Sequence, residues 1–314
     1  MAAAASNGSH STVADAAAST MQHTSRAHSV RSRTLKKKYV WSPPRRLALT
    51  LSLIHASGID ARLMNKLASY DMLLADNLKT YVPLLLIAIK CLPALLLAYA
   101  TPRRARITAV ALIACALGDL ALAIDDLGDS TTCGGVPVPC FLLGLGAFLI
   151  GHGAFAAAVV LASHNAKDAK LSAIGRTLTN VPWSVLGAVL GAYIVNHAPK
   201  DLQGPVSLYC GAISLMATCA LRYHASVTKA DAIPARLAHA GAAFFVLSDT
   251  ILGLDRFVPD SPYLPFAQSN RDARRLWIML TYYGAIFLLA ESARYVRTAG
   301  ANATAGAAAA KKQQ

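Results

Sequence analysis

Two aspartates in similar surroundings are the residues of this chain best suited to carry out chemistry. Residues 117–125 read LGDLALAID and residues 247–255 read LSDTILGLD, so Asp119 and Asp249 each stand inside an otherwise apolar run. A charge within a membrane span costs about 2.5–3.5 kcal/mol, which makes such a carboxyl group a functional candidate. Two carboxyl groups held close together in an apolar site differ in pKa, so one can donate a proton while the other is ionised. This pattern predicts an acid–base pair or, alternatively, part of a proton relay.

Other polar side chains occur in the same apolar runs and are candidates for binding a substrate. They are Lys90, Asp126, His152, Arg256, Tyr282 and Tyr283. Asp126 follows Asp119 by seven residues, and Arg256 follows Asp249 by seven, so each pair shares one helix face. Counted from the expected helix ends, Lys90 and the two tyrosines lie in one layer with the two aspartates, His152 lies deeper, and Asp126 and Arg256 lie at the helix ends. The simpler interpretation, a set of buried ion pairs, explains one pair better than groups from five helices.

The apolar runs that carry these residues predict an α-helical membrane protein. Of the 314 residues, 55% are hydrophobic and 15% are charged, whereas about a quarter are charged in soluble proteins. The runs have the length of about 20 residues that a helix needs to cross a bilayer. We expect an all-α transmembrane bundle of about eight spans, a weak one at 45–57 and stronger ones at 81–99, 106–124, 139–163, 178–196, 204–221, 237–255 and 276–297.

The net charge of +14 is distributed as in a membrane protein and does not indicate nucleic-acid binding. With eight spans, both basic tails and most of the basic loops fall on one side, which the positive-inside rule makes cytosolic. The loop at 256–275 is the exception. The two aspartate motifs then lie in the third and seventh spans, which run parallel and suggest a four-plus-four internal duplication.

The ends of the chain indicate its organisation and location. We expect a disordered basic tail at 1–40, a membrane domain at 41–298 and a second disordered tail at 299–314. The first tail also has the Arg/Ser-rich, acid-poor composition of an organellar transit peptide. The final KKQQ resembles the dilysine signal of endoplasmic reticulum proteins, although lysines that only keep a tail soluble give the same pattern.

Signals for other chemistry are missing from the sequence. It contains no GxSxG, HExxH or phosphate-binding glycine loop, and the histidines of the spans are too scattered to indicate a metal site. A zinc hydrolase is therefore disfavoured, and we expect no metal and no cofactor. Cys133 and Cys140 share a loop and would form a disulfide if that loop faces an oxidising lumen.

Taken together, the motifs resemble the YhhN family of membrane proteins, the lysoplasmalogenases. The segments LGDLALAIDD, GLGAFLIGHGAF, GAAFFVLSDTILGLDRF and IMLTYYGAIFLLAESA carry the resemblance over roughly residues 80–297, together with KCLP at 90–93. The resemblance implies an eight-span hydrolase that cleaves the vinyl ether bond of lysoplasmalogens, giving a fatty aldehyde and glycerophosphoethanolamine or glycerophosphocholine. It implies functional roles for the two motif aspartates and for Lys90, Asp126, His152, Tyr282 and Tyr283. The chain departs from the family pattern at Phe155 and Ile286, where polar side chains are common, which bears on head-group preference.

The implied chemistry matches the paired carboxyl groups. Protonation of the β-carbon of a vinyl ether creates an oxocarbenium ion, and water then adds to give a hemiacetal that collapses to aldehyde and alcohol. Two aspartates on adjacent helices would provide the acid and the stabilising anion, with Asp249 favoured as the acid. The expected partners are a lysophospholipid and the bilayer. A proton-coupled transporter with the same carboxylates is the alternative, and the oligomeric state is left open.

Overall fold

The structure is a computed structural model that describes residues 42–58, 72–125, 139–165, 172–227, 232–259 and 271–295. From Pro44 onward these residues belong to one compact unit, and the description below concerns that unit. Both predicted tails, Asp126 and Cys133 lie outside the described residues. Cys140, the residue expected to pair with Cys133, is disulfide-bonded.

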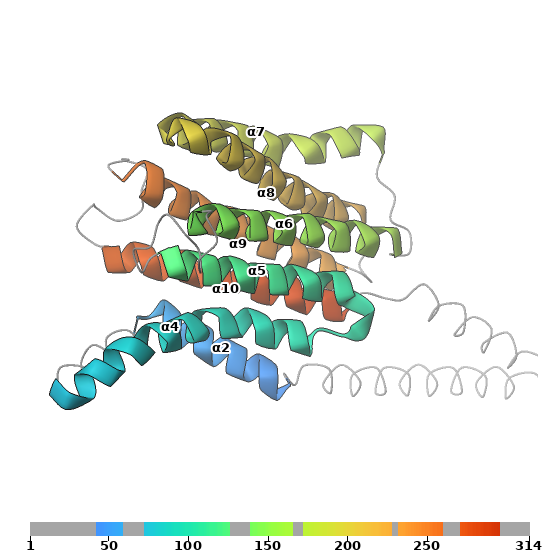
Figure 1. Ribbon diagram of the computed structural model, residues 1–314. Coiled ribbons are helices and arrows are strands. Elements are labelled where there is room, and N and C mark those ends of the chain that lie inside the picture. The colour runs from blue at the N-terminus through green and yellow to red at the C-terminus, as the bar shows by residue number, and fades with distance from the viewer. Residues whose placement is uncertain are drawn as a thin grey trace, which may run out of the picture. The chain divides into compact units, whose positions relative to one another are not determined.

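All secondary structure in the described part of the chain is helical (Figure 1). The α-helices are α2 (Pro43–Ala56), α4 (Met72–Ala100), α5 (Arg106–Asp125), α6 (Cys140–Asn165), α7 (Ala173–His197), α8 (Lys200–Ser226), α9 (Ala232–Phe257) and α10 (Arg271–Arg294), with a short 3-10 turn, η1 (Arg103–Ala105), between α4 and α5. The predicted all-α bundle is confirmed. The four-plus-four duplication stays a prediction.

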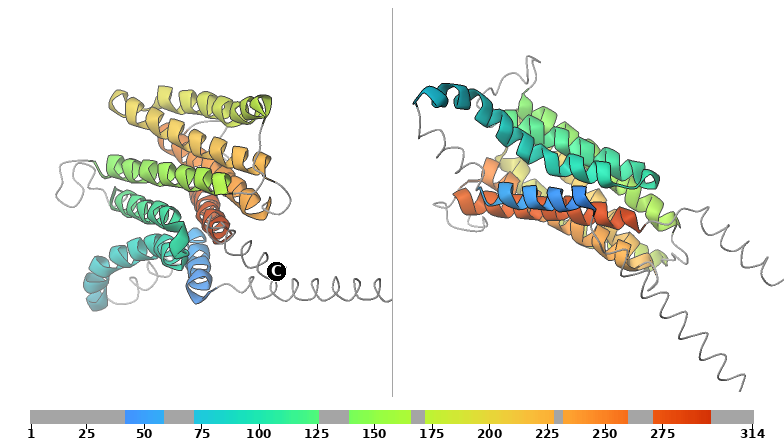
Figure 2. Two further views of the ribbon diagram at one scale, coloured as in Figure 1. Left: turned by 90° about the vertical axis from the view of Figure 1, so that its right-hand side faces the viewer. Right: turned by 90° about the horizontal axis from the view of Figure 1, so that it is seen from below.

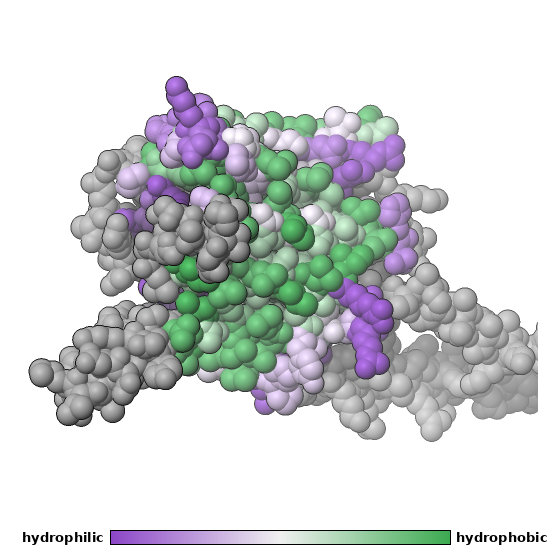
Figure 3. Space-filling model, viewed as in Figure 1, coloured by the Kyte–Doolittle hydropathy of each residue, from purple (hydrophilic) through white to green (hydrophobic). Residues whose placement is uncertain are grey.

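The helices have the length and composition of membrane spans. Six of those described, α5 to α10, are long and apolar enough to cross a bilayer. The described apolar part of α4, Leu84–Ala100, is shorter, and α2 has 14 residues. Figure 3 shows hydrophobic residues over the middle of the helices and hydrophilic residues toward their ends. The chain is therefore a multi-pass membrane protein, while the count of eight spans and the sidedness stay predictions.

Prolines and one serine define where several helices begin. Pro139 and Pro199 directly precede α6 and α8, positions where the missing N–H of proline breaks no intrahelical hydrogen bond. Ser172 caps α7, since its Oγ accepts a hydrogen bond from the Gly175 N–H at 3.0 Å. Only Ala198 and Pro199 separate α7 from α8, so these two helices form a tight hairpin.

The packing places α7 at the edge of the bundle. Helix α5 packs on α4, α6 and α10, whereas α9 packs on α8 and α10, and α6 also packs on α8. Helix α7 packs mainly on α8 and contacts α9 to a lesser extent; its buried residues are Gly191 and Ile194. Figure 1 shows α7 as the outermost helix on the side opposite α2 and α4. The polar residues of interest lie on α5, α6, α8, α9 and α10, with Lys90 on α4.

A buried ion pair connects α2 to α10. Arg45, 2% exposed, forms an ion pair with Glu291 and donates a hydrogen bond to the Ala100 carbonyl at 3.1 Å. Arg294 contacts the other oxygen of the same carboxylate at 3.0 Å. In the right-hand view of Figure 2, α2 is drawn in front of α10 and runs in a similar direction. Sequence analysis did not single out this pair, and its position at the ends of three helices identifies it as structural.

Candidate active site

Asp249 is held by two side chains from neighbouring helices. The hydroxyl of Tyr209, on α8, donates a hydrogen bond to Asp249 Oδ2. His152 Nε2, on α6, lies 2.9 Å from the Tyr209 oxygen and 3.4 Å from Asp249 Oδ2. Because the tyrosine proton is directed at the carboxylate, the tyrosine oxygen accepts a hydrogen bond from the N–H at His152 Nε2. The other ring nitrogen, Nδ1, is buried and has no hydrogen-bond partner among the described residues.

Asp119 has its own tyrosine partner on a different helix. The Tyr282 hydroxyl, on α10, donates to Asp119 Oδ2 at 2.6 Å, and Asp119 is 3% exposed. The neighbouring Tyr283 hydroxyl donates to the backbone carbonyl of Lys90 at 3.1 Å. The Lys90 side chain is near enough to interact electrostatically with Asp119. Tyr282 therefore contacts Asp119 and Lys90 acts on its charge, while Tyr283 joins the Tyr282 ring to the Lys90 backbone.

Aromatic rings stand between the two aspartates. The Phe245 ring contacts His152 edge-on at 4.7 Å between centroids and contacts Tyr282 at 5.6 Å. The two carboxylates interact through their charges, but each is hydrogen-bonded to its own tyrosine. The expectation that they lie on adjacent helices is wrong, because α5 and α9 do not pack along each other and α10 contacts both.

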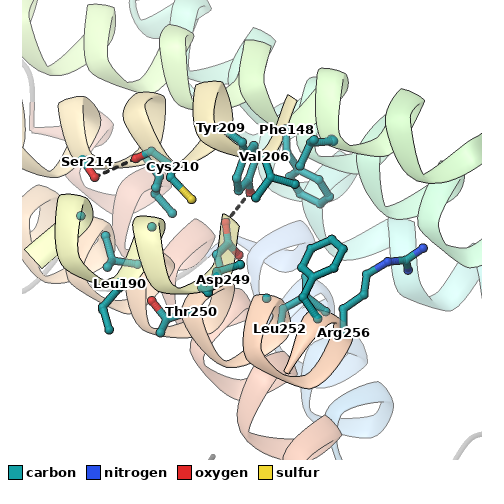
Figure 4. Close-up of a pocket in the computed structure, with 18 of the residues that line it drawn as sticks. Phe148, Leu190, Val206, Tyr209, Cys210, Ser214, Asp249, Thr250, Leu252 and Arg256 are labelled. Carbon is teal, nitrogen blue, oxygen red and sulfur yellow. Dashed lines mark hydrogen bonds between the residues drawn. The ribbon is translucent and has the colours of Figure 1, made fainter. Parts of the chain in front are cut away.

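Asp249 faces an apolar pocket between α6, α7, α8 and α9 (Figure 4). The pocket offers about 90 Å³ to the centres of water-sized molecules. Its lining is apolar apart from a few groups, of which Asp249, Tyr209 and Arg256 are the most polar. Phe148 lines the pocket and contacts Tyr282 edge-on at 6.0 Å, whereas Asp119 is not part of the lining. Asp249 can therefore touch a molecule in the pocket, and Asp119 lies behind the wall.

Arg256 marks the polar end of this pocket. Asp249 and Arg256 both line it, which agrees with the prediction that residues seven apart share a helix face. The Arg256 guanidinium donates to Asp125 Oδ2 at 3.0 Å and lies 3.9 Å from the centroid of the Phe141 ring. Its side chain is 37% exposed, so it also reaches solvent or lipid head groups. Asp126, which follows Asp119 as Arg256 follows Asp249, lies outside the described residues.

Two features of the site were not anticipated. Tyr209 joins His152 to Asp249, and a tyrosine within a predicted span was the available signal, as it was for Tyr282. His152 was placed deeper than Asp249 by counting along the helices, but the two side chains meet. His152 lies twelve residues from the start of α6 and Asp249 eight from the end of α9. That difference of four residues corresponds to about 6 Å of helix rise. The two side chains meet because the start of α6 and the end of α9 are offset along the helix axes.

The described residues contain no group of three or more His, Cys, Asp or Glu side chains placed to hold a metal ion. Among protein families, the model described as the YhhN family matches residues 80–293. The matched segment includes both aspartates, the two tyrosines and histidine that contact them, and Arg256, but it leaves out α2. No curated protein and no solved structure matches the chain.

Proposed function

This chain belongs to the YhhN family, which includes lysoplasmalogenases, and on that premise we propose that it hydrolyses the vinyl ether bond of a lysoplasmalogen. The observation that carries the proposal is the carboxyl group of Asp249 in an apolar pocket with a cation at one end. A lysophospholipid has the matching form, a single hydrocarbon chain joined through a short glycerol unit to an anionic phosphate.

The spacing of Asp249 and Arg256 suits such a substrate. Seven residues correspond to about 10 Å along the helix axis. The distance between the carboxyl and guanidinium groups becomes shorter or longer as the two side chains change rotamer. Arg256 already binds the Asp125 carboxylate. A substrate phosphate bound beside Arg256 would place the sn-1 ether near Asp249. The hydrocarbon chain would then lie against the leucine, isoleucine and phenylalanine side chains that line the pocket.

In this proposal Asp249 is the acid. A proton passes from the Asp249 oxygen that does not bond to Tyr209 to the β-carbon of the alkene, and positive charge develops on the α-carbon and the ether oxygen. Water adds to the α-carbon, and its released proton restores the carboxyl group. The hemiacetal then breaks its bond to the glycerol oxygen while its hydroxyl proton passes to that oxygen, which gives the aldehyde and the free alcohol. Tyr209 and His152 stabilise the carboxylate that exists between the two proton transfers, because the tyrosine donates to it.

Asp119 takes the second role, that of the anion which stabilises the cationic intermediate. It acts through its electric field from behind Phe148 and Phe245, in a medium of low dielectric constant where charges act over longer distances. Tyr282, Tyr283 and Lys90 hold this carboxylate in place and set its charge. They therefore affect the substrate through Asp119, while Arg256 binds the head group.

The test is aldehyde release by purified protein in detergent. A lysoplasmalogen should yield aldehyde, whereas a lysolipid with a saturated alkyl ether should bind without reacting, because it has no alkene to protonate. Ester-linked lysolipids should release little fatty acid. Comparable release of fatty acid would indicate a lipase, and the absence of any aldehyde in detergent would favour a proton-coupled transporter, which needs a sealed membrane to act.

A further inference from the structure

The wall of the Asp249 pocket between α7 and α8 is built of small residues. Four of them, Gly187, Gly191, Cys210 and Ser214, line both this pocket and a second hollow on the outer side of the same two helices. A Cβ atom added at Gly191 would lie 3.1 Å from the Cys210 Cβ, and one added at Gly187 would overlap the Ser214 side chain. Only these small side chains therefore separate the two hollows, and we call this contact the α7–α8 seam.

The outer hollow is a groove formed by α7 and α8 alone, and it is more polar than the pocket. It offers about 720 Å³ to the centres of water-sized molecules. Asn180, Ser184, Ser207, Thr218 and Arg222 are among its lining residues. Thr218 is 7% exposed, and its hydroxyl has no hydrogen-bond partner in the part of the chain that the structure describes. Polar side chains at these positions of a membrane span suit a ligand in the groove that carries a hydroxyl group.

Helix α7 is the part of the wall that can move. Its two buried residues, Gly191 and Ile194, lie near its carboxyl end, where Ile194 packs with Val206 of α8 and Leu254 of α9. The remainder of α7 packs mainly on α8 and presents large apolar side chains such as Leu178 and Val189 outward. Figure 4 shows Cys210 and Ser214 of α8 beside Leu190 of α7, and the Ser214 hydroxyl is directed to the Cys210 carbonyl of its own helix. A small outward shift of α7 would therefore connect the groove to the pocket.

We propose that the α7–α8 seam is the lateral entrance of the site and that the groove is the first binding site of a single-chain lipid with a free hydroxyl. The identity of that lipid as a lysoplasmalogen rests on the proposed function. A long hydrocarbon chain resides in the bilayer, and passage through the polar end at Arg256 would first bring it into water. Passage through the seam keeps the chain in apolar surroundings, while the groove's hydroxyl and amide groups bond to the glycerol hydroxyl.

Cys210 permits a direct test, because Gly191→Cys places a second thiol across the seam. The Cβ–Cβ distance of 3.1 Å at this position is a few tenths of an ångström below the range of about 3.5–4.5 Å found in disulfides, so a slight separation of the helices suffices. Oxidation with a membrane-permeable oxidant should then fix α7 to α8, which intact mass would show as the loss of two hydrogen atoms. Two substrates are compared, a long-chain lysoplasmalogen in vesicles and a water-soluble analogue with a short alkenyl chain.

The oxidised Gly191→Cys protein should lose at least tenfold in turnover of the long-chain substrate, keep its turnover of the short-chain analogue, and recover with a reductant. Gly191→Ala controls for the added side chain, and Gly191→Cys with Cys210→Ser controls for the oxidant; neither should respond to oxidation. Full turnover of the long-chain substrate by the bridged protein would refute the proposal that the seam is the entrance. The groove would then be a contact between copies of the chain, and light scattering would show a dimer. Equal loss of both substrates would also overturn the proposal, because the bridge would then damage the site itself. A wild-type protein inactive on both substrates would instead refute the proposed function.

Discussion

Replacing Asp249 by asparagine separates catalysis from structural support most directly. The amide has the shape of the carboxyl group and its oxygen can still accept the hydrogen bond from Tyr209. The folded state should therefore lose only about 1 kcal/mol or less, the net contribution of one hydrogen bond. The proton for the β-carbon is lost, so turnover should fall by about 10²–10⁴-fold, the usual contribution of a general acid. That range corresponds to about 3–5 kcal/mol of transition-state free energy.

Glu291→Gln provides the matched control, because Glu291 is also a carboxylate within a span but belongs to an ion pair that we interpret as structural. The substitution leaves Arg45, 2% exposed, without its ionic partner, and breaking a buried pair in this way costs about 3–5 kcal/mol. We expect a lower yield of folded protein and a lower unfolding temperature for Glu291→Gln, but not for Asp249→Asn.

Two assays on the same preparations decide the comparison, namely aldehyde release per folded molecule and thermal unfolding in detergent. A stable Asp249→Asn protein with near-wild-type turnover would refute the role of Asp249 as the acid. An Asp249→Asn protein as unstable as Glu291→Gln would show that Asp249, too, is mainly structural.

Three further predictions concern the remaining parts of the site. Asp119→Asn should lower kcat by at least ~10²-fold, and the double variant with Asp249→Asn should be little worse than either single one, since groups that act as a unit are non-additive. Arg256→Gln should raise KM for a phosphate-bearing substrate roughly tenfold with kcat nearly unchanged, as expected for loss of uniform binding; an unchanged KM would mean that the head group lies elsewhere. In microsomes, a glycosylation sequon introduced at 128–138 should be modified, whereas the natural sequons at Asn7 and Asn302 should not, and glycan on either natural site would refute the cytosolic orientation of the tails.

The architecture could be predicted from sequence because the membrane allows few solutions. A span must satisfy its backbone hydrogen bonds internally, so an apolar run of about 20 residues is almost always a helix. The same regularity placed Asp249 and Arg256 on one helix face, and both line the pocket. It also drew attention to most of the polar residues that surround the two aspartates, since each stands out within an apolar run.

The partners of these residues could not be predicted, because they depend on which helices become neighbours. Tyr209 is 40 residues from Asp249 and Tyr282 is 163 residues from Asp119, and no helical period relates such distant positions. The Arg45–Glu291 pair joins residues 246 apart and was missed, although Glu291 lies as far inside its predicted span as Asp249 does. The duplicated motif likewise did not predict which helices are neighbours, since its two copies lie on helices that do not pack along each other.

The two copies of the motif differ in their surroundings, and this difference explains how one chain uses two similar aspartates. Asp119 is bonded to Tyr282, whose ring contacts Phe148 of the pocket wall, and it is not part of the pocket lining, so it would act on a bound molecule only through its charge. Asp249 keeps 12% of its side chain exposed and lines the pocket beside Tyr209, so it can exchange a proton with a bound molecule. An acid must touch the atom that it protonates, whereas an anion that stabilises a cation need not. We therefore propose that Asp249 carries the proton and Asp119 the fixed charge, a division that the two sequence motifs alone do not contain.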